Sequence, residues 1–249
     1  MNEAAKTKTV PVNDIAMHVE RQGAGTPLLL LHGGGGVGEN WKLVFAAPPP
    51  GYELIIPDLR GHGRSTNPGG TITCRQLASD VVALMDVLRI ERFRAIGVSL
   101  GAKTLLHVAT QQPARVESMV LVSATPYFPE PTRALMRAAA ANTPGDAEWS
   151  RMRGWHVHGD DQIRALWAMP RQLADDYEDL SFTPPRLGRI KARTMVVHGD
   201  RDFLYPVSLA VSDCHRAILA CRGDAPEPRR TTTRPGAPTV DPRGARIAA

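Results

Sequence analysis

The chain has 249 residues, of which 43% are apolar, 22% charged and 5% aromatic, a composition typical of a globular domain. This composition excludes a chain that is disordered throughout, fibrous or stapled by disulfides. The formal net charge is +5, and +3 of it lies in residues 222–249, where six arginines outnumber three acidic residues. The rest of the chain is close to neutral, so its charge gives no support for nucleic-acid binding.

No apolar run approaches the roughly 18 residues that span a bilayer, and the first ten residues lack the apolar centre of a secretory signal. We therefore expect a cytoplasmic protein that does not insert into membranes. The three cysteines, Cys74, Cys214 and Cys221, cannot all pair within one chain, and we expect all of them to be reduced.

The first predicted elements are two strands, Lys8–Val12 and Ile15–Glu20, joined by the turn Asn13-Asp14. After this hairpin, short apolar runs alternate with helical patterns, which is typical of a mostly parallel sheet flanked by helices. The further predicted strands are Leu28–Leu31, Leu54–Ile56, Phe93–Val98, Val116–Val122 and Met195–Val197.

Two helices are predicted between these strands. The first has one apolar face with spacings of three and four residues, and the second runs from Leu100 to about Gln112 and ends before Pro113. The apolar face of the first helix is formed by Leu77, Val81, Leu84, Met85 and Leu88.

The alternation stops at residue 125 and resumes near residue 190. We interpret residues 1–124 and 188–221 as the α/β core and residues 125–187 as a helical lid, because an insertion of this length is too long for a plain loop. Residues 208–221 have a further helical pattern. Residues 222–249 have no aromatic side chain and few large aliphatic ones, so we expect a disordered tail.

The strongest chemical signal is Gly97-Val98-Ser99-Leu100-Gly101, which follows a predicted strand and precedes a predicted helix. In this context G-x-S-x-G indicates a nucleophile elbow: small neighbours let the backbone turn sharply while the serine hydroxyl stays accessible. The alternative is a serine that caps the helix between two unrelated glycines.

A second glycine-rich turn, residues 33–36, follows the strand Leu28–Leu31. Such a turn can direct backbone N–H groups into a cavity, and acyl transfer needs two donors for its oxyanion. We predict the amides of Gly34 and Leu100 in this role. The same run also fits G-x-G-x-x-G with Asp58 twenty residues beyond it, a dinucleotide-binding spacing that many patterns would match in so glycine-rich a segment.

Two aspartates follow the strand Met195–Val197, in the segment His198-Gly-Asp-Arg-Asp202. A carboxylate at a strand end can orient an imidazole and stabilise its charged form. The alternative is an acidic turn in which the carboxylate is satisfied by nearby backbone amides, and this alternative describes Asp200 better than Asp202.

Taken together, the glycine turn with Trp41, DLRGHGRS at 58–65, GVSLG at 97–101 and VVHGDRDFLYP at 196–206 resemble the α/β-hydrolase superfamily over roughly residues 10–218. The resemblance implies Ser99 as the nucleophile, Asp202 as the acid of the triad, and a lid that selects the substrate. A serine at the elbow, in place of aspartate, argues against the dehalogenase and epoxide-hydrolase branches.

The resemblance also implies a catalytic histidine about 20 to 30 residues after the acid, and no histidine occurs there. His215 is the only histidine after Asp202, so we name it as the candidate base. Lys103, four residues after Ser99, is a weaker candidate, and we expect it to be a solvated lysine instead. His156 and His158 in the lid are also weaker candidates. We hypothesise that the C-terminus past about residue 218 has been replaced, for example by a frame shift, so that the last strand is missing and residues 194–197 form an unpaired edge.

Two functions follow from the sequence. The first is a serine hydrolase of small ester-like substrates that forms an acyl-enzyme on Ser99, with activity impaired if no histidine serves it. The second is a catalytically silent binding protein that keeps the pocket. We expect a small-molecule substrate and no metal, cofactor, nucleic-acid or membrane partner, while oligomeric state and substrate identity stay open.

Overall fold

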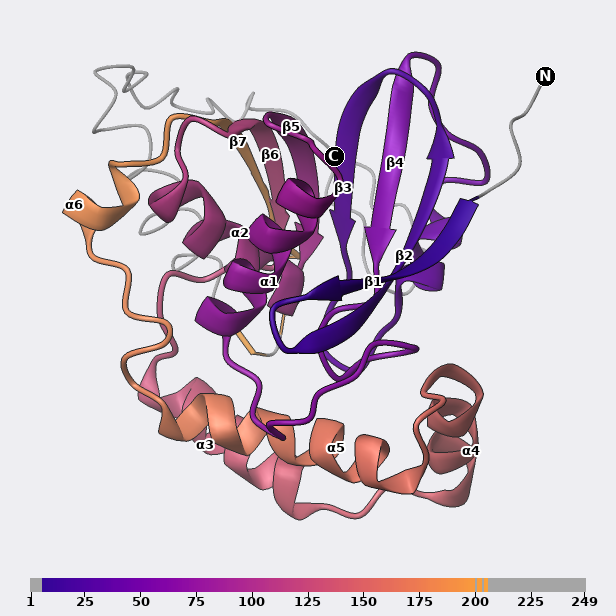
Figure 1. The fold of residues 1–249 in the computed structure, drawn as a ribbon. Coiled ribbons are helices and arrows are strands. Elements are labelled where there is room, and N and C mark those ends of the chain that lie inside the picture. The colour runs from indigo at the N-terminus through magenta and orange to yellow at the C-terminus, as the bar shows by residue number, and fades with distance from the viewer. Residues whose placement is uncertain (1–5, 200, 203, 206–249) are drawn as a thin grey trace, which may run out of the picture.

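The computed structural model describes residues 6–199, 201, 202, 204 and 205 (Figure 1). Their strands form one sheet in the order β1-β2-β4-β3-β5-β6-β7. The strands are β1 (Lys6–Val12), β2 (Ile15–Gly23), β3 (Thr26–Leu31), β4 (Tyr52–Pro57), β5 (Phe93–Val98), β6 (Val116–Val122) and β7 (Arg193–Val197). All seven contain the predicted strands, and the ends differ by a few residues.

The sheet is antiparallel at one side and parallel across the rest. Strand β2 pairs antiparallel with both β1 and β4, whereas the pairs β3–β4, β3–β5, β5–β6 and β6–β7 are parallel. The predicted α/β class with a mostly parallel sheet is therefore confirmed.

Helices α1 (Cys74–Val87) and α2 (Leu100–Gln111) cover one face of this sheet (Figure 1). Helix α1 begins where the Thr73 side chain accepts a hydrogen bond from the Gln76 amide at 3.0 Å, a standard N-cap. Its predicted apolar residues Leu77, Val81, Leu84 and Met85 are buried. Helix α2 is buried from residue 100 to residue 110, which places the residues after Ser99 in the interior.

The leucines of β3 alternate between two apolar clusters, as the period of two in a strand requires. Leu29 and Leu31 belong to the large core on the helix-covered face. Leu28 and Leu30 pack with Trp41 in a smaller cluster. Trp41 belongs to a short 3-10 helix, η1 (Gly38–Leu43), which was not predicted from the sequence.

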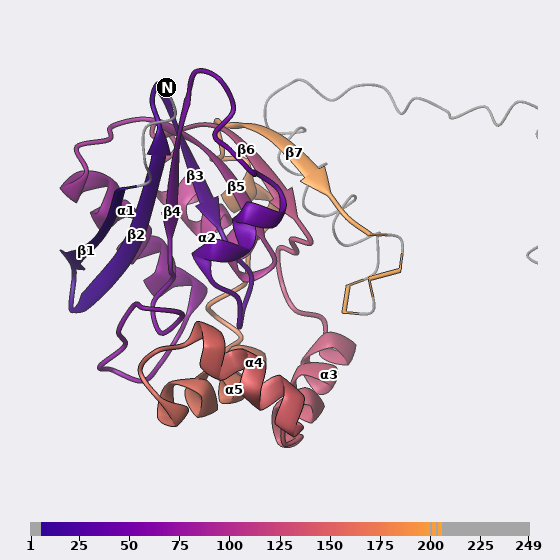
Figure 2. The same ribbon diagram turned by 90° about the vertical axis from the view of Figure 1, so that its right-hand side faces the viewer.

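Residues 125–187 contain four helices: α3 (Glu130–Ala141), α4 (Asp146–Trp155), α5 (Asp160–Asp175) and α6 (Pro184–Leu187). Helices α3, α4 and α5, which we call the cap, lie beyond the ends toward which β3 and β4 point (Figures 1 and 2). The segment leaves and rejoins the core at one place, where Tyr127 bridges Ser181 and the Phe182 amide donates to the Pro126 carbonyl at 3.0 Å. The role of the cap as a lid stays a prediction.

Strand β7 is the edge of the sheet formed by the described residues. Its Met195 and Val197 side chains are 60% and 43% exposed. The predicted helix over 208–221, the tail, the missing strand, Cys214, Cys221 and His215 lie outside the described residues. Within them, Cys74 is a free, buried cysteine, and none of their helices has both the length and the apolarity to cross a membrane.

Candidate active site

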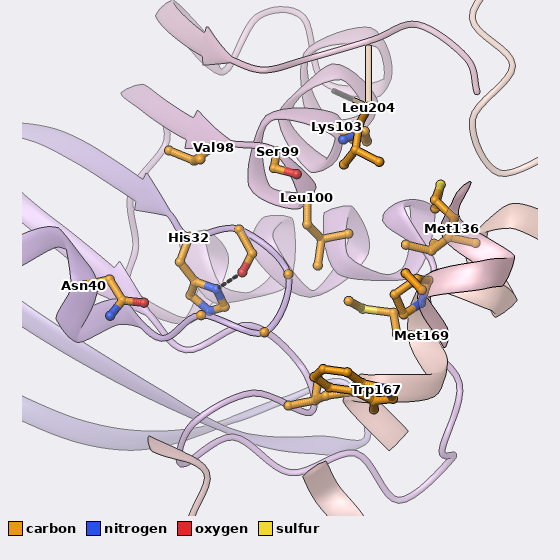
Figure 3. A pocket seen from close by; sticks show the side chains of 18 of the residues that line it. His32, Asn40, Val98, Ser99, Leu100, Lys103, Met136, Trp167, Met169 and Leu204 are labelled. Carbon is orange, nitrogen blue, oxygen red and sulfur yellow. Dashed lines mark hydrogen bonds between the residues drawn. The ribbon is translucent and has the colours of Figure 1, made fainter. Parts of the chain in front are cut away.

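Ser99 lies at a sharp turn between β5 and α2. Its backbone has φ 49° and ψ −106°, the left-handed region that side-chain-bearing residues seldom adopt. The side chain makes no capping hydrogen bond to α2, so the alternative of a helix-capping serine is wrong. Instead, Ser99 lines a cavity between the sheet and the cap (Figure 3).

The two glycines of the motif are needed because backbone segments meet here without room for a side chain. A Cβ atom on Gly97 would lie 2.6 Å from the Gly101 carbonyl carbon, and one on Gly101 would lie 2.5 Å from the Leu31 carbonyl oxygen. Strand β3, strand β5 and helix α2 therefore converge beneath Ser99. This convergence holds the strained serine backbone in place.

The glycine turn after β3 lies directly beside Ser99. A Cβ atom on Gly33 would be 3.6 Å from the Ser99 Cβ, and Gly34 and Leu100 line the same cavity as Ser99. Within the described part of the chain, neither the Gly34 nor the Leu100 amide donates a hydrogen bond. The structure thus brings together three of the predicted site residues, Ser99, Gly34 and Leu100. The amides of Gly34 and Leu100 have no acceptor among the described residues.

Buried His32 supports this glycine turn, and buried His62 packs against the His32 ring, with the two ring centres 5.0 Å apart. The Nε2 atom of His32 accepts from the Leu59 amide at 2.9 Å, so its Nδ1 donates to the Gly33 carbonyl at 2.8 Å (Figure 3). The Nδ1 atom of His62 lies 2.9 Å from the Arg60 carbonyl. Burial lowers the pKa of His32 to about 4 and that of His62 to about 3, so both rings are neutral near pH 7.

His156 joins the cap to the same turn. Its Nδ1 accepts from the Gly63 amide at 2.9 Å, which leaves Nε2 to donate to the Gly35 carbonyl at 3.2 Å. Burial lowers the pKa of His156 as well. The His158 ring lies 3.1 Å from the Arg64 carbonyl. Neither cap histidine lines the cavity, so the idea that one of them is the base for Ser99 is wrong.

Asp58 has a structural position that excludes the dinucleotide-binding alternative. Its Oδ1 accepts from the Gly38 amide at 2.7 Å and its Oδ2 accepts from the Arg64 amide at 2.9 Å. The carboxylate is therefore not free to bind a ribose. The glycine run is also followed by the short helix η1 in place of the α-helix that such a motif requires.

The cavity has a volume of about 640 Å³ and a mostly apolar wall. Trp155, Leu166, Trp167 and Met169 come from the cap, and Lys103 comes from α2. Lys103 is buried, with 2% of its surface exposed. The sequence favoured a solvated lysine, and this expectation is wrong because α2 is buried on the side that carries Lys103.

Asp202 lies in the loop that follows β7. Its Oδ1 accepts from the amides of Leu204 and Tyr205 at 2.9 and 3.1 Å, and its Oδ2 is 3.9 Å from Nε2 of His198. Leu204 and Tyr205 line the cavity, whereas Asp202 does not. The turn arrangement expected for Asp200 therefore describes the Asp202 carboxylate. Asp200 itself lies outside the described residues.

Among the described histidines, only His32 lines the cavity, and both of its ring nitrogens are engaged. The candidate base His215 lies outside the described residues. The described part of the chain also contains no group of three or more His, Cys, Asp or Glu side chains arranged to hold a metal ion.

A mostly parallel sheet, a serine at a strained strand-to-helix turn and a helical insertion over the strand ends define a protein of the α/β-hydrolase type. Residues 26–186 match the sequence model of the family described as alpha/beta hydrolase fold, and the chain belongs to this family.

The chain is 28% identical over 229 residues to 2-hydroxymuconate semialdehyde hydrolase of Pseudomonas sp. (strain CF600), a match that covers 80% of this chain and 79% of that enzyme. It is 37% identical over 102 residues to an uncharacterized protein of Mycobacterium tuberculosis (strain CDC 1551 / Oshkosh), where it covers 41% of this chain but only 30% of the relative's length. Among solved structures, a hydrolase from Pseudomonas aeruginosa PA01 superposes with a TM-score of 0.68 at 22% identity, covering 86% of each chain.

Proposed function

We propose that this chain is a serine hydrolase that cleaves small ester-like substrates through an acyl-enzyme on Ser99. The observation that carries the proposal is the Ser99 backbone, held in a left-handed conformation by close backbone packing, with the side chain at a cavity. Strain of this kind persists only where the surroundings enforce it, and it is concentrated at functional sites.

In the proposed reaction the Ser99 hydroxyl oxygen attacks the substrate carbonyl carbon as a base takes its proton. The amides of Gly34 and Leu100 then donate to the carbonyl oxygen as it becomes an anion, and their lack of acceptors in the described chain supports this role. The leaving alcohol departs with a proton, and water hydrolyses the acyl-enzyme. We assign the base to His215 and its orientation to Asp202, both as predictions from the family resemblance.

The cavity supports small substrates with an apolar part. A volume of about 640 Å³ is within the usual range for small-molecule sites, and tryptophan and methionine side chains form much of the wall. The relative from Pseudomonas sp. is named for a semialdehyde, itself a carbonyl compound, and this agrees with a small carbonyl substrate here. The cytoplasmic location expected from the sequence stays a prediction.

Labelling with a fluorophosphonate probe tests the proposal. We expect covalent labelling of the wild-type chain that Ser99→Ala abolishes. Ser123→Ala is a matched control, since Ser123 follows the neighbouring strand β6 with φ 53° but does not line the cavity. Labelling that survives Ser99→Ala, or that disappears in Ser123→Ala, would overturn the assignment.

A second function, a binding protein without turnover, is favoured by one observation. No described histidine has a free ring nitrogen at the cavity, so among these residues Ser99 has no imidazole base. Removing the histidine of subtilisin lowers turnover by about 10⁶-fold. Under this alternative the wild-type chain binds small ligands in the cavity but is not labelled at Ser99.

A further inference from the structure

Lys103 has an unusual environment for a charged side chain. It lies one turn after Ser99 on α2 and lines the same cavity, as Leu204 does (Figure 3). Only 2% of its surface is exposed, and within the described part of the chain its ammonium group makes no hydrogen bond or ion pair. Its described neighbours are aromatic faces: Nζ lies 4.7 Å from the ring centre of Tyr205 and 5.5 Å from that of Phe128.

The described contacts of Lys103 add little to the stability of the fold. A buried ammonium group loses its hydration and regains the loss only through charged or hydrogen-bonding partners. Contacts with two ring faces compensate part of the loss but give the three N–H donors no acceptor among the described residues. A positive charge in the first turn of a helix is also opposed by the helix dipole.

The cavity itself offers no carboxylate to Lys103. Glu148 is the only acidic residue among those that line the cavity in the described chain, and its carboxylate is already bound by Arg151, whose Nε lies 3.0 Å from Oε2. The unused donors of Lys103 therefore face a mostly apolar space that also contains the Ser99 hydroxyl.

We propose that Lys103 binds a carboxylate group of the substrate, so that the substrate is a small anion with a reactive carbonyl group a short distance from its carboxylate. This inference rests on the proposed function in so far as it places the substrate in the Ser99 cavity. Binding supplies the missing partner for the ammonium group, and the aromatic faces of Tyr205 and Phe128 hold the lysine chain in position. Lys103 is then a residue that determines specificity.

Equilibrium binding tests the inference without requiring turnover. Calorimetry would compare 3-phenylpropanoate with its neutral amide, 3-phenylpropanamide, on the wild-type chain and on Lys103→Met and Lys103→Arg. We expect the wild-type chain to prefer the carboxylate by about 10-fold or more, the effect of a charged hydrogen bond in a buried site. Lys103→Met is expected to remove this preference and Lys103→Arg to keep part of it.

Lys103→Met has nearly the same shape and removes an unpaired buried charge, so we expect it to fold, as checked by thermal unfolding. Lys103→Gln, prepared in parallel, gives a second neutral variant. Equal binding of carboxylate and amide by the wild-type chain, or an unchanged carboxylate preference in the folded neutral variants, overturns the inference.

The same variants separate this inference from the proposed hydrolysis. A carboxylate preference that depends on Lys103, in a chain whose Ser99 is not labelled by fluorophosphonate, supports the binding role while the hydrolase proposal fails. Loss of Ser99 labelling in Lys103→Met, together with equal binding of carboxylate and amide by the wild-type chain, assigns Lys103 to the activation of Ser99 and overturns its role in substrate binding.

Discussion

The predicted catalytic residues lie in two regions that are built very differently, a nucleophile end at Ser99 and an acid end at Asp202. At the nucleophile end, Ser99 follows β5, a central strand, and buried backbone from β3 and α2 presses against its turn. At the acid end, Asp202 follows β7, the edge of the described sheet, and its carboxylate is held by two amides of its own loop.

The difference shows what each kind of functional residue requires. A serine in a left-handed conformation stays there only when many neighbours fix it, and central strands provide such neighbours on both sides. A carboxylate in a turn needs only the following amides, so its local geometry can form at a sheet edge. The nucleophile end therefore depends on the core, and the acid end on a short segment of chain.

Asp202→Asn gives the largest expected effect and tests whether the acid end takes part in catalysis. If Asp202 orients the base, the variant should slow fluorophosphonate labelling of Ser99 by about 10⁴-fold, as loss of the negative charge does in serine proteases. The asparagine oxygen still accepts from Leu204 and Tyr205, so the loop should keep its shape.

Asp176→Asn is the matched control for this experiment. Asp176 in the cap accepts from the amides of Glu178 and Asp179, both at 2.9 Å, in the same turn arrangement. We expect fluorophosphonate to label Ser99 of Asp176→Asn at the rate seen for the wild-type chain. Equal labelling of Asp202→Asn and the wild-type chain would limit Asp202 to a role in its turn.

The nucleophile end should also make stability depend on pH. His32 and His62 are neutral in the folded chain, with pKa values lowered by burial to about 4 and about 3 from 6.5. The unfolded chain binds protons at these rings below about pH 6.5, so acidification toward pH 4 favours unfolding. Each ring contributes up to about 1.4 kcal/mol per pH unit in that interval.

Urea denaturation between pH 7.5 and pH 4.5 measures this dependence. The free energy of unfolding should be nearly flat above pH 7 and fall below about pH 6.5. The slope should be smaller in His32→Gln. Stability that is constant down to pH 5 would show that these rings are not held neutral.

Cavity-creating substitutions on adjacent strands compare the core with the sheet edge. Leu121 on β6 is fully buried, and Leu121→Ala should cost about 3 kcal/mol of unfolding free energy. Met195 on β7 is 60% exposed, and Met195→Ala should cost less than about 1 kcal/mol. Chemical denaturation measures both values. Equal losses of unfolding free energy in Leu121→Ala and Met195→Ala would contradict the exposed position of Met195.

A pair of glycine substitutions gives the smallest expected difference in stability between the two ends. Gly101→Ala places a Cβ against the β3 backbone and should cost about 2 kcal/mol and reduce Ser99 labelling. Gly199→Ala, after β7, has open space around the added atom and should stay within about 0.5 kcal/mol of the wild-type chain. Identical melting curves for the two variants would mean that the elbow is less tightly packed than described.

By itself, the sequence determined the features whose signal is local. The alternation of apolar runs predicted the strands and helices α1 and α2, and Gly97, Ser99 and Gly101 predicted the turn, because a sharp strand-to-helix corner has a fixed requirement for small neighbours. The motif order was sufficient to indicate the family.

Only the tertiary structure decided how distant segments share one environment. It placed β4 between β2 and β3 and used Asp58 and His156 to support loops. It also buried Lys103 near Ser99, with two aromatic rings and no described carboxylate as neighbours of its ammonium group. None of these outcomes has a sequence period or spacing, because burial and partners depend on segments that are far apart in the chain and meet only when it folds.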